Sequence, residues 1–284
     1  MSGSERAPAE DREAPSPDAV ARAVLAALDE RRQIAPLGAE GPGLRLDEAY
    51  RVTASVRRIR EARGERAVGR KIGFTNTTIW DEYGVRAPIW GYVYDTTLHR
   101  PEGLAGTFSL ARTVEPRIEP EIVLGLARAP EPDMDEAALL GCLDFVAHGF
   151  EVVQSLFPGW RFTAADTVAA FGLHGALLMG PPAAVTPANA AAWGASLAGF
   201  RITLLRDGAE ADRGRAENVL GGGPLAALRH LVRVLAEDPE SPPLAAGEVV
   251  TTGTLTRALP VAPGETWSTR LDGLPLAGVT VAFA

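Results

Sequence analysis

Residues 115–126 read Glu-Pro-Arg-Ile-Glu-Pro-Glu-Ile-Val-Leu-Gly-Leu, so two carboxylates stand directly before a run of apolar residues. Residues i and i+2 of a strand face the same side, so Glu119 and Glu121 are expected to point together. Burying two neighbouring carboxylates is costly unless something compensates their charge. A divalent cation would do so. Alternatively, the flanking prolines permit an edge strand on which both side chains stay in water.

A third acid lies in a similar setting. Glu151 is the one charged residue of the apolar segment 150–153. It fits either an outward position of an alternating strand or a place beside the other two carboxylates. Three Glu side chains without a partnering His or Cys would form an all-oxygen site. Such a site favours Mg²⁺ or Mn²⁺, and then Ca²⁺, over Zn²⁺.

Lys71 is the only lysine of the chain, because the other 27 of its 28 basic residues are arginines. Arg keeps its proton near neutral pH, whereas a buried Lys can lose it. A chain that avoids Lys elsewhere and keeps one indicates that this position needs an amine. The alternative is a surface lysine that survives by chance.

The composition excludes several classes of protein. The chain has 284 residues, of which 46% are hydrophobic, and a net charge of −8, which argues against nucleic acid or an anionic membrane as a partner. Cys142 is the only cysteine, so neither an intrachain disulfide nor a cysteine metal cage is expected. No apolar run approaches the roughly 18 residues of a membrane span. The first 17 residues lack the apolar segment of a signal peptide, so we expect a cytoplasmic protein.

Hydrophobic periodicity predicts four helices. The first two cover residues 18–31, with Asp18 as the expected N-cap, and residues 46–63. Two further helices are expected over residues 134–147 and 224–236. Short apolar runs between Gly and Pro predict strands over residues 89–94, 121–126, 150–153, 175–179, 199–205, 248–252 and 276–283.

These elements predict three parts of the chain. Residues 1–17 are expected to form a disordered tail because they are rich in Ser, Pro, Glu and Ala. Residues 18–68 would form a small helical segment. Residues 69–284 would form a β-rich domain of the α+β class that carries the metal site.

Five blocks of the sequence also carry a resemblance to a known family. They are Gly69-Arg-Lys-Ile-Gly-Phe-Thr75; Pro116-Arg-Ile-Glu-Pro-Glu-Ile122; Phe150-Glu-Val-Val153 with Asp166-Thr167; Asn218-Val-Leu-Gly221 with Pro224-Leu-Ala; and Thr252-Gly-Thr-Leu255 with Pro260-Val-Ala-Pro-Gly264. In this order they resemble the motifs of the 2-keto-4-pentenoate hydratase and 4-oxalocrotonate decarboxylase family. Each block alone is unspecific, but five in register, over about residues 46–284, are specific.

The resemblance implies the fold of the fumarylacetoacetase C-terminal domain, a mixed β-roll or sandwich around a metal. It implies Glu119, Glu121 and Glu151 as ligands of Mg²⁺ or Mn²⁺, and Lys71 as the catalytic amine. We expect supporting roles for Asp166 and His174, and for His174 the alternatives are an acid or base in the reaction and a cap of its own turn. The expected substrate-binding residues are Arg70, Gly73, Trp90, Thr252, Gly253 and Thr254. For the two threonines the alternative is that they satisfy backbone groups in a turn.

The sequence departs from the family pattern near the expected pocket. Many hydratases carry Pro-Asp-x-Gly where this chain has Pro88-Ile-Trp90-Gly91, and we interpret Trp90 as the replacement of that acid. Gln154 stands where the family usually has Asp, in Glu-x-x-Asp-Ser-Arg. His174 ends the segment Phe171-Gly-Leu-His174, where an Asn/Ser-rich turn is more usual.

The resemblance predicts a metal-dependent lyase that adds water to a 2-hydroxy-2,4-dienoate. Decarboxylation of a 2-oxo-3-enedioate and C–C hydrolysis of an acylpyruvate stay open, because the departures affect the surroundings of the reacting carbons. A non-catalytic partner subunit is the alternative from another class. The expected partner is a small 2-oxo or 2-hydroxydienoic acid. The protein is expected to form a homo-oligomer, alone or with a sister enzyme of its pathway.

Overall fold

The structure, a computed structural model, describes residues 15–39 and 43–284. The disordered tail predicted for residues 1–17 lies mostly outside these described residues. Its last part is ordered, because Ser16 caps the first helix and Pro17 begins it. Proline suits this place since it has no N–H to leave unsatisfied. The cap is therefore Ser16 and not the predicted Asp18, whose carboxylate accepts a hydrogen bond from Ser55 Oγ at 2.6 Å.

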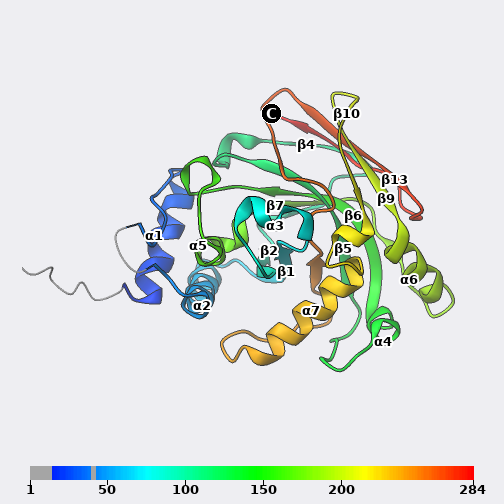
Figure 1. Cartoon of the computed structure of the whole chain (residues 1–284), viewed down its shortest axis with the longest axis horizontal. Helices are drawn as coiled ribbons and strands as arrows, with labels where there is room; N and C mark the ends of the chain where they lie inside the picture. Colours follow the sequence, from blue (N-terminus) through cyan, green and yellow to red (C-terminus); the bar gives the residue numbers. More distant parts are fainter. Residues whose placement is uncertain (1–14, 40–42) are drawn as a thin grey trace, which may run out of the picture.

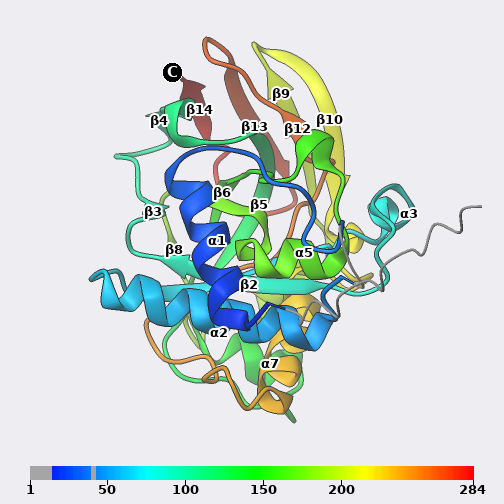
Figure 2. The same cartoon turned by 90° about the vertical axis from the view of Figure 1, so that its left-hand side faces the viewer.

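The two predicted N-terminal helices, α1 (Pro17–Asp29) and α2 (Leu46–Ala62), lie side by side on one flank of the molecule (Figure 1, Figure 2). They share one hydrophobic core with α5 (Ala164–Ala169). Val24, Val52 and Val168 come from these three helices, and Phe157 and Ile89 join them. The helical segment thus shares a hydrophobic core with α5 and with Ile89 of β2.

The larger sheet forms the frame of the site. Its main order is β2-β1-β11-β5-β6-β7-β3, with β12 beside β5 and β8 beside β6. β1 pairs parallel with β11 and β3 with β7, whereas the other pairs are antiparallel. β2 also lies against β7, so the sheet curls into a roll. The bounds are β1 Ala67–Gly73, β2 Ile89–Tyr94, β3 Leu98–His99, β5 Arg117–Leu126, β6 Leu143–Val153, β7 His174–Met179, β8 Ala183–Ala184, β11 Val249–Thr251 and β12 Leu259–Pro260.

A second sheet packs on the outer face of this roll, in the order β10-β9-β13-β14-β4. Phe150 and Leu178 of the first sheet meet Leu204, Trp267 and Phe283 of the second in one core. The bounds are β4 Ala105–Phe108, β9 Arg201–Arg206, β10 Ala209–Arg215, β13 Thr266–Asp272 and β14 Thr280–Phe283. The two sheets and the helices form the predicted α+β roll.

The remaining helices are α3 (Trp80–Tyr83), α4 (Glu136–Leu140), α6 (Ala190–Gly199) and α7 (Pro224–Glu237), of which α7 was predicted. The helix predicted over residues 134–147 is wrong. Only α4 is helical there, with Asp135 as its cap, and the chain turns at Gly141 and Cys142 into β6. β6 pairs along the whole of β5, and these tertiary pairings outweigh the local helical spacing.

Strand alternation divides the residues of the roll between two faces. Glu119 and Glu121 face the inside of the roll, as does Glu151, which is the direct cross-strand partner of Glu119. Small apolar residues including Val93, Val123, Ala147, Leu177 and Val249 fill the rest of this inner face. The three carboxylates therefore meet inside the sheet.

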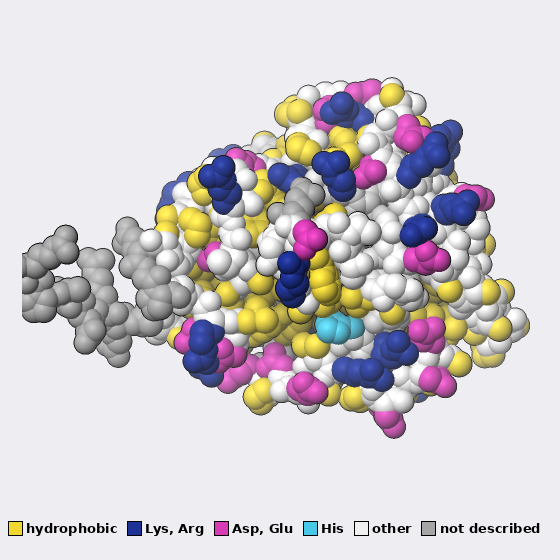
Figure 3. Space-filling view, viewed as in Figure 1, with side chains coloured by type: hydrophobic (Ala, Val, Ile, Leu, Met, Phe, Trp, Pro, Cys, Tyr) yellow, Lys and Arg dark blue, Asp and Glu magenta, His cyan; other side chains and the backbone are white. Residues whose placement is uncertain are grey.

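The surface carries no continuous charged area on the face that Figure 3 shows, where basic and acidic side chains are interspersed. Among the described residues, no helix is long and apolar enough to cross a membrane.

Gly69 tests the pairing of β1 with β11. A Cβ at this position would lie 2.1 Å from Val249 O, a backbone atom that cannot move without opening the pair. We expect Gly69→Ala to lower the free energy of unfolding by about 3 kcal/mol or more, measured by urea denaturation. Gly199→Ala is the matched control, because its Cβ would enter open space at the end of α6. Equal free energies of unfolding for Gly69→Ala and Gly199→Ala would contradict the pairing of β1 with β11.

Candidate metal and catalytic site

Three glutamates converge inside the roll. One carboxylate oxygen from each of Glu119, Glu121 and Glu151 lies within 4.8 Å of the others. Glu121 and Glu151 are fully buried, and Glu119 lines a small cavity. β5 has β6 on one side and β11 and β12 on the other, so the edge-strand alternative for Glu119 and Glu121 is wrong.

Two of the carboxylate oxygens have no hydrogen-bond partner among the described residues, Glu121 Oε1 and Glu151 Oε2. The other oxygen of each group is held. Glu121 Oε2 accepts from Gly253 N at 2.8 Å, and Glu151 Oε1 lies 2.6 Å from His174 Nδ1. Buried polar atoms without partners are rare in folded proteins. Convergent, unpartnered hard oxygens of this kind fit a small divalent cation.

Lys71 extends into the same space from β1. Its Nζ donates to Gly172 O at 2.9 Å and lies 3.3 Å from Glu151 Oε2. Burial alone would lower the pKa of this amine, but the three carboxylates outweigh it and raise the pKa above its usual value. The amine has room because Gly73 and Gly172 lack side chains: a Cβ on them would lie 3.3 Å from Nζ and 3.1 Å from Cδ.

The surroundings shift the pKa values of the three carboxylates in different directions. Burial raises the pKa of Glu119 to about 7, helped by Glu151 and opposed by Lys71 and Arg117. Burial, with repulsion from the other two carboxylates, raises the pKa of Glu121 well above its usual range. Burial acts in the same direction on Glu151, but Lys71 and His174 prevail and lower its pKa. Without a cation, the cluster therefore retains protons.

A small cavity of about 30 Å³ opens beside these groups. A cavity of this volume has room for two or three water molecules, because each water molecule needs roughly 10–15 Å³ of such space. Its polar lining comes mainly from Lys71, Glu119, Thr254 and the phenol of Tyr83. The apolar lining consists of Phe74, Ile79, Ile89, Val153, Trp160, Leu173 and Ala258.

Arg70 and Trp90, predicted to bind substrate, do not line this cavity. The Arg70 guanidinium lies 4.0 Å from the ring centre of Tyr92 and 3.2 Å from Glu248. Trp90 belongs to the main hydrophobic core. Neighbours in a strand face opposite sides, so Arg70 cannot share the side of Lys71. The structure contradicts these two predicted substrate contacts.

Ile89 takes the place expected for Trp90. It lines the cavity, and a Cβ on Gly73 would lie 3.1 Å from its Cγ1. In the pattern Pro-Asp-x-Gly the acid follows Pro directly, and here Ile89 follows Pro88. The acid is thus replaced by Ile89, and Trp90 stands at the variable position.

The 252–254 segment is divided in its roles. The Thr252 hydroxyl donates to Ile122 O, so the backbone alternative holds for this residue. Gly253 offers its N–H to Glu121 and has a φ of 92°, and a Cβ there would collide with Thr75 Oγ1. Thr254 lines the cavity, although its hydroxyl donates to the backbone carbonyl of Thr256.

Asp166 lies outside the carboxylate cluster. Its Oδ1 accepts from Leu37 N at 2.9 Å, and its Oδ2 accepts from Thr163 N and Oγ1 at the start of α5. It therefore ties the N-terminal segment to α5. Gln154 similarly accepts from Val114 N through its amide oxygen.

Other residues at the site were not predicted. Gly172 supplies the carbonyl for Lys71, and Thr97 contacts His174. Tyr83, at the end of α3, and Trp160, at the end of the 3₁₀ turn Pro158–Trp160, also line the cavity. Only Gly172 left a signal in the sequence, because it lies in the segment Phe171-Gly-Leu-His174, which departs from the family pattern. The others come from segments far apart in the sequence, whose meeting depends on the fold.

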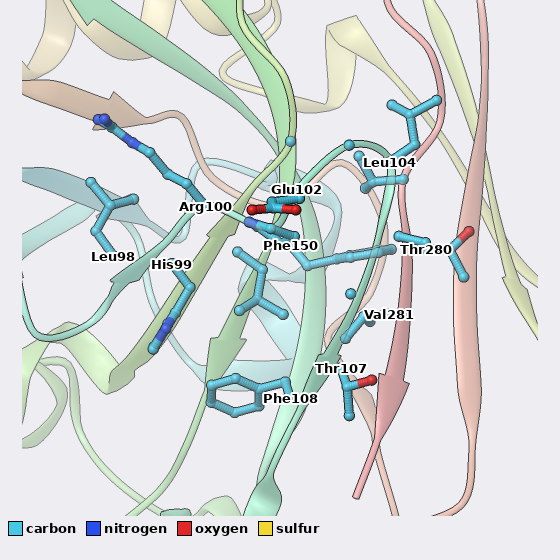
Figure 4. Close-up of a pocket in the computed structure, with 17 residues that line it drawn as sticks. Leu98, His99, Arg100, Glu102, Leu104, Thr107, Phe108, Phe150, Thr280 and Val281 are labelled. Atoms are coloured by element: carbon cyan, nitrogen blue, oxygen red, sulfur yellow. The ribbon is translucent and has the colours of Figure 1, made fainter.

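A larger cavity of about 530 Å³ lies on the outer face of the roll (Figure 4). Phe108, Phe150 and Val281 are among the residues that line it. Phe150 and Glu151 point to opposite faces of β6, so the strand separates this cavity from the carboxylates. It is therefore distinct from the candidate site.

Known proteins resemble the chain in sequence and in fold. No family model matches the chain. It is 30% identical over 249 residues to 2-hydroxyhexa-2,4-dienoate hydratase of Comamonas testosteroni, covering 87% of this chain and 90% of that protein. It is 31% identical over 235 residues to 4-oxalocrotonate decarboxylase of Pseudomonas sp. (strain CF600), covering 82% and 84%.

Solved structures share the fold. The 4-oxalocrotonate decarboxylase from Pseudomonas putida G7, complexed with magnesium and adipate, superposes with a TM-score of 0.83 at 26% identity, over 94% of this chain and 97% of that one. A putative fumarylacetoacetate isomerase/hydrolase from Oleispira antarctica gives a TM-score of 0.54 at 15% identity, over 77% and 95%. The second likeness shows the fold alone.

The raised pKa of Glu119 predicts a pH-dependent stability in EDTA. An acid whose folded pKa lies above its unfolded value of roughly 4.3 stabilises the fold at low pH, and that contribution disappears as the pH rises through about 7. Gln stays neutral. We therefore expect the difference in Tm between Glu119→Gln and the wild type, measured by thermal denaturation, to shift by roughly 3–6 °C in favour of the variant as the pH rises from 5 to 7.5.

The matched control is Glu240→Gln, since Glu240 is exposed. Its Tm should follow that of the wild type at every pH. A constant difference between Glu119→Gln and the wild type would show that Glu119 is not titrating in this window.

Proposed function

The chain belongs to the 2-keto-4-pentenoate hydratase and 4-oxalocrotonate decarboxylase family, and we propose that it is a metal-dependent lyase that adds water to a 2-hydroxy-2,4-dienoic acid. Membership makes it an enzyme of the hydratase or decarboxylase kind. One observation carries the metal-dependent part of this proposal. Three buried carboxylates meet within 4.8 Å, beside the only lysine of the chain.

Glu119, Glu121 and Glu151 would hold Mg²⁺ or Mn²⁺. Two of their oxygens lack a hydrogen-bond partner among the residues that the structure describes, and all the donors are hard oxygens. The related decarboxylase structure contains magnesium, and a second structure of it contains calcium. When bound, the cation supplies Lewis-acid polarisation of the oxygens of a 2-oxo acid.

Lys71 would move the proton. Among the described residues that line the cavity it is the only amine, and Gly172 O fixes the position of its Nζ. We assign to Lys71 the proton transfer that converts a 2-hydroxy-2,4-dienoate into the 2-oxo-3-enoate. In this step the enol oxygen on C2 loses its proton and C5 gains one. One water then adds across C3=C4, with its oxygen on C4, and gives the 4-hydroxy-2-oxo acid.

The apolar wall would receive the hydrocarbon part of the substrate. Phe74, Ile79 and Ile89 lie on this wall, and burial of apolar surface favours a short hydrocarbon chain there. Closure of the wall also limits bulk water near the reacting carbons.

A second candidate, decarboxylation of a 2-oxo-3-enedioate, is favoured by Ile89. This residue stands where many hydratases of the family have an acid, so the wall lacks a carboxylate to position water. In decarboxylation the terminal C–C bond breaks, CO₂ leaves, and the electron pair enters the conjugated 2-oxo system, which takes up a proton. The same lack of a water-positioning acid disfavours C–C hydrolysis.

A non-catalytic partner subunit is the least supported candidate. Such a subunit would not require Glu119, Glu121, Glu151 and Lys71 to be assembled around one cavity, yet all four meet there. The homo-oligomer and the sister enzyme stay predictions.

An ultraviolet assay tests the proposed reaction. The substrates are 2-hydroxypenta-2,4-dienoate and 2-oxo-3-hexenedioate, each with Mg²⁺, with Mn²⁺ and with EDTA. We expect metal-dependent loss of the dienoate absorbance, with 4-hydroxy-2-oxopentanoate as the product. Lys71→Arg should lower kcat by about 10²–10⁴-fold, since it keeps the charge but cannot release the proton.

Arg66→Lys is the control for Lys71→Arg, because Arg66 is exposed and the exchange introduces an amine elsewhere. It should retain wild-type turnover. Release of CO₂ from the diacid alone would assign the chain to the decarboxylases. Full activity in EDTA would overturn the metal-dependent mechanism for both reactions.

A further inference from the structure

His174 is a buried side chain held at both ring nitrogens. Nδ1 lies 2.6 Å from Glu151 Oε1, and Nε2 lies 2.9 Å from Thr97 Oγ1. Both contacts reach across the fold, to residues 23 and 77 positions away in the sequence. They are therefore tertiary contacts: the backbone N–H of His174 caps its own turn by donating to Phe171 O, whereas its side chain does not.

The far contact of the ring is itself fixed. Thr97 Oγ1 accepts from Tyr94 N and donates to Tyr94 O, each at 3.1 Å. The turn between β2 and β3 thus sets the position of the hydroxyl, and the hydroxyl sets the plane of the imidazole. A ring held in this way offers Nδ1 to Glu151 in one orientation.

A strained turn delivers the ring to this place. Phe171, Gly172 and Leu173 all have left-handed φ angles of 61° to 64°, which is unusual for Phe and Leu. This turn aims Gly172 O at Lys71 and places His174 at the start of β7. One short segment therefore holds both the lysine and the third carboxylate.

The consequence concerns the two oxygens of Glu151. Oε1 is occupied by His174, and Oε2 is left without a hydrogen bond, 3.3 Å from Lys71 Nζ. We propose that His174 is a positioning residue that reserves Glu151 Oε2 for the cation and makes Glu151 a one-oxygen ligand. This inference rests on the proposed metal role of the three glutamates. Partners behind a metal ligand commonly set its orientation and the affinity of the site.

Two isosteric exchanges separate the two contacts. In His174→Asn the amide nitrogen stands near the place of Nδ1 and can still donate to Glu151. In His174→Gln it stands near the place of Nε2 and can reach only Thr97. The dissociation constant for Mn²⁺ is measured by electron paramagnetic resonance of the free ion, which does not depend on turnover.

We expect His174→Gln to bind Mn²⁺ about 10- to 100-fold more weakly than the wild type, and His174→Asn to stay within about threefold. Excess Mn²⁺ should restore much of kcat in His174→Gln with little change in the substrate KM, but not in Lys71→Arg. Thr97→Val supports the test if His174→Gln does not fold, and it should weaken Mn²⁺ binding because the ring loses its far anchor.

The outcomes are distinct. Unchanged Mn²⁺ affinity in His174→Gln and Thr97→Val, or equal losses for Asn and Gln, would overturn the positioning role. Glu119→Gln is measured in the same series and should lose Mn²⁺ binding. If Glu119→Gln binds as the wild type does, the proposed metal site itself fails, and the inference about His174 fails with it.

Discussion

The burial of three carboxylates on the inner face of one curled sheet is the constraint on which the site depends. Glu119 and Glu121 are two positions apart on β5, and β6 places Glu151 directly opposite Glu119. Such a cluster is unfavourable in a low-dielectric interior unless positive charge or protons reach it. Groups on three sides of the cluster supply positive charge or hydrogen bonds to the carboxylates. Lys71 approaches from β1, His174 from β7, and the Gly253 amide from the segment after β11.

These three supports divide the carboxylate oxygens into two kinds. The oxygens that face the amide of Gly253 and the ring of His174 are held, whereas Glu121 Oε1 and Glu151 Oε2 have no hydrogen-bond partner among the described residues, and Glu151 Oε2 lies 3.3 Å from Lys71 Nζ. Rigid backbone elements carry the supports, since a side chain on Gly253 would collide with Thr75 and the turn before His174 is strained. The fixed backbone thus restricts the carboxylates so that the same two oxygens stay available. Such restriction pre-organises a cation site.

That Glu119, Glu121, Glu151 and Lys71 come together could be predicted from the sequence, because the signals are local, whereas their roles stay predictions. The i, i+2 spacing of Glu119 and Glu121 and the single lysine need no knowledge of the fold. The predictions failed for residues that are neighbours in the sequence but face opposite sides of a strand. Arg70 and Trp90 stand next to Lys71 and Ile89 but face the other side of their strands. The helix expected over residues 134–147 failed because β6 gains a full ladder with β5. The contact of His174 with Glu151 and Thr97 joins three strand regions and leaves no local pattern.

The distribution of the departures from the family pattern separates two parts of the chemistry. The base, with its three glutamates and Lys71, retains the family pattern, and these are the groups that we propose for proton transfer on a conjugated 2-oxo acid, the step shared by hydratases and decarboxylases. The departures concentrate on the wall and behind the ligands, at Ile89 and His174. An apolar wall changes which group on the distal carbons is stabilised and how water reaches them, whereas it leaves the charge at the base unaltered. We therefore propose that the branch between adding water and losing CO₂ is decided at the wall, where Ile89 stands in place of the acid that many hydratases carry.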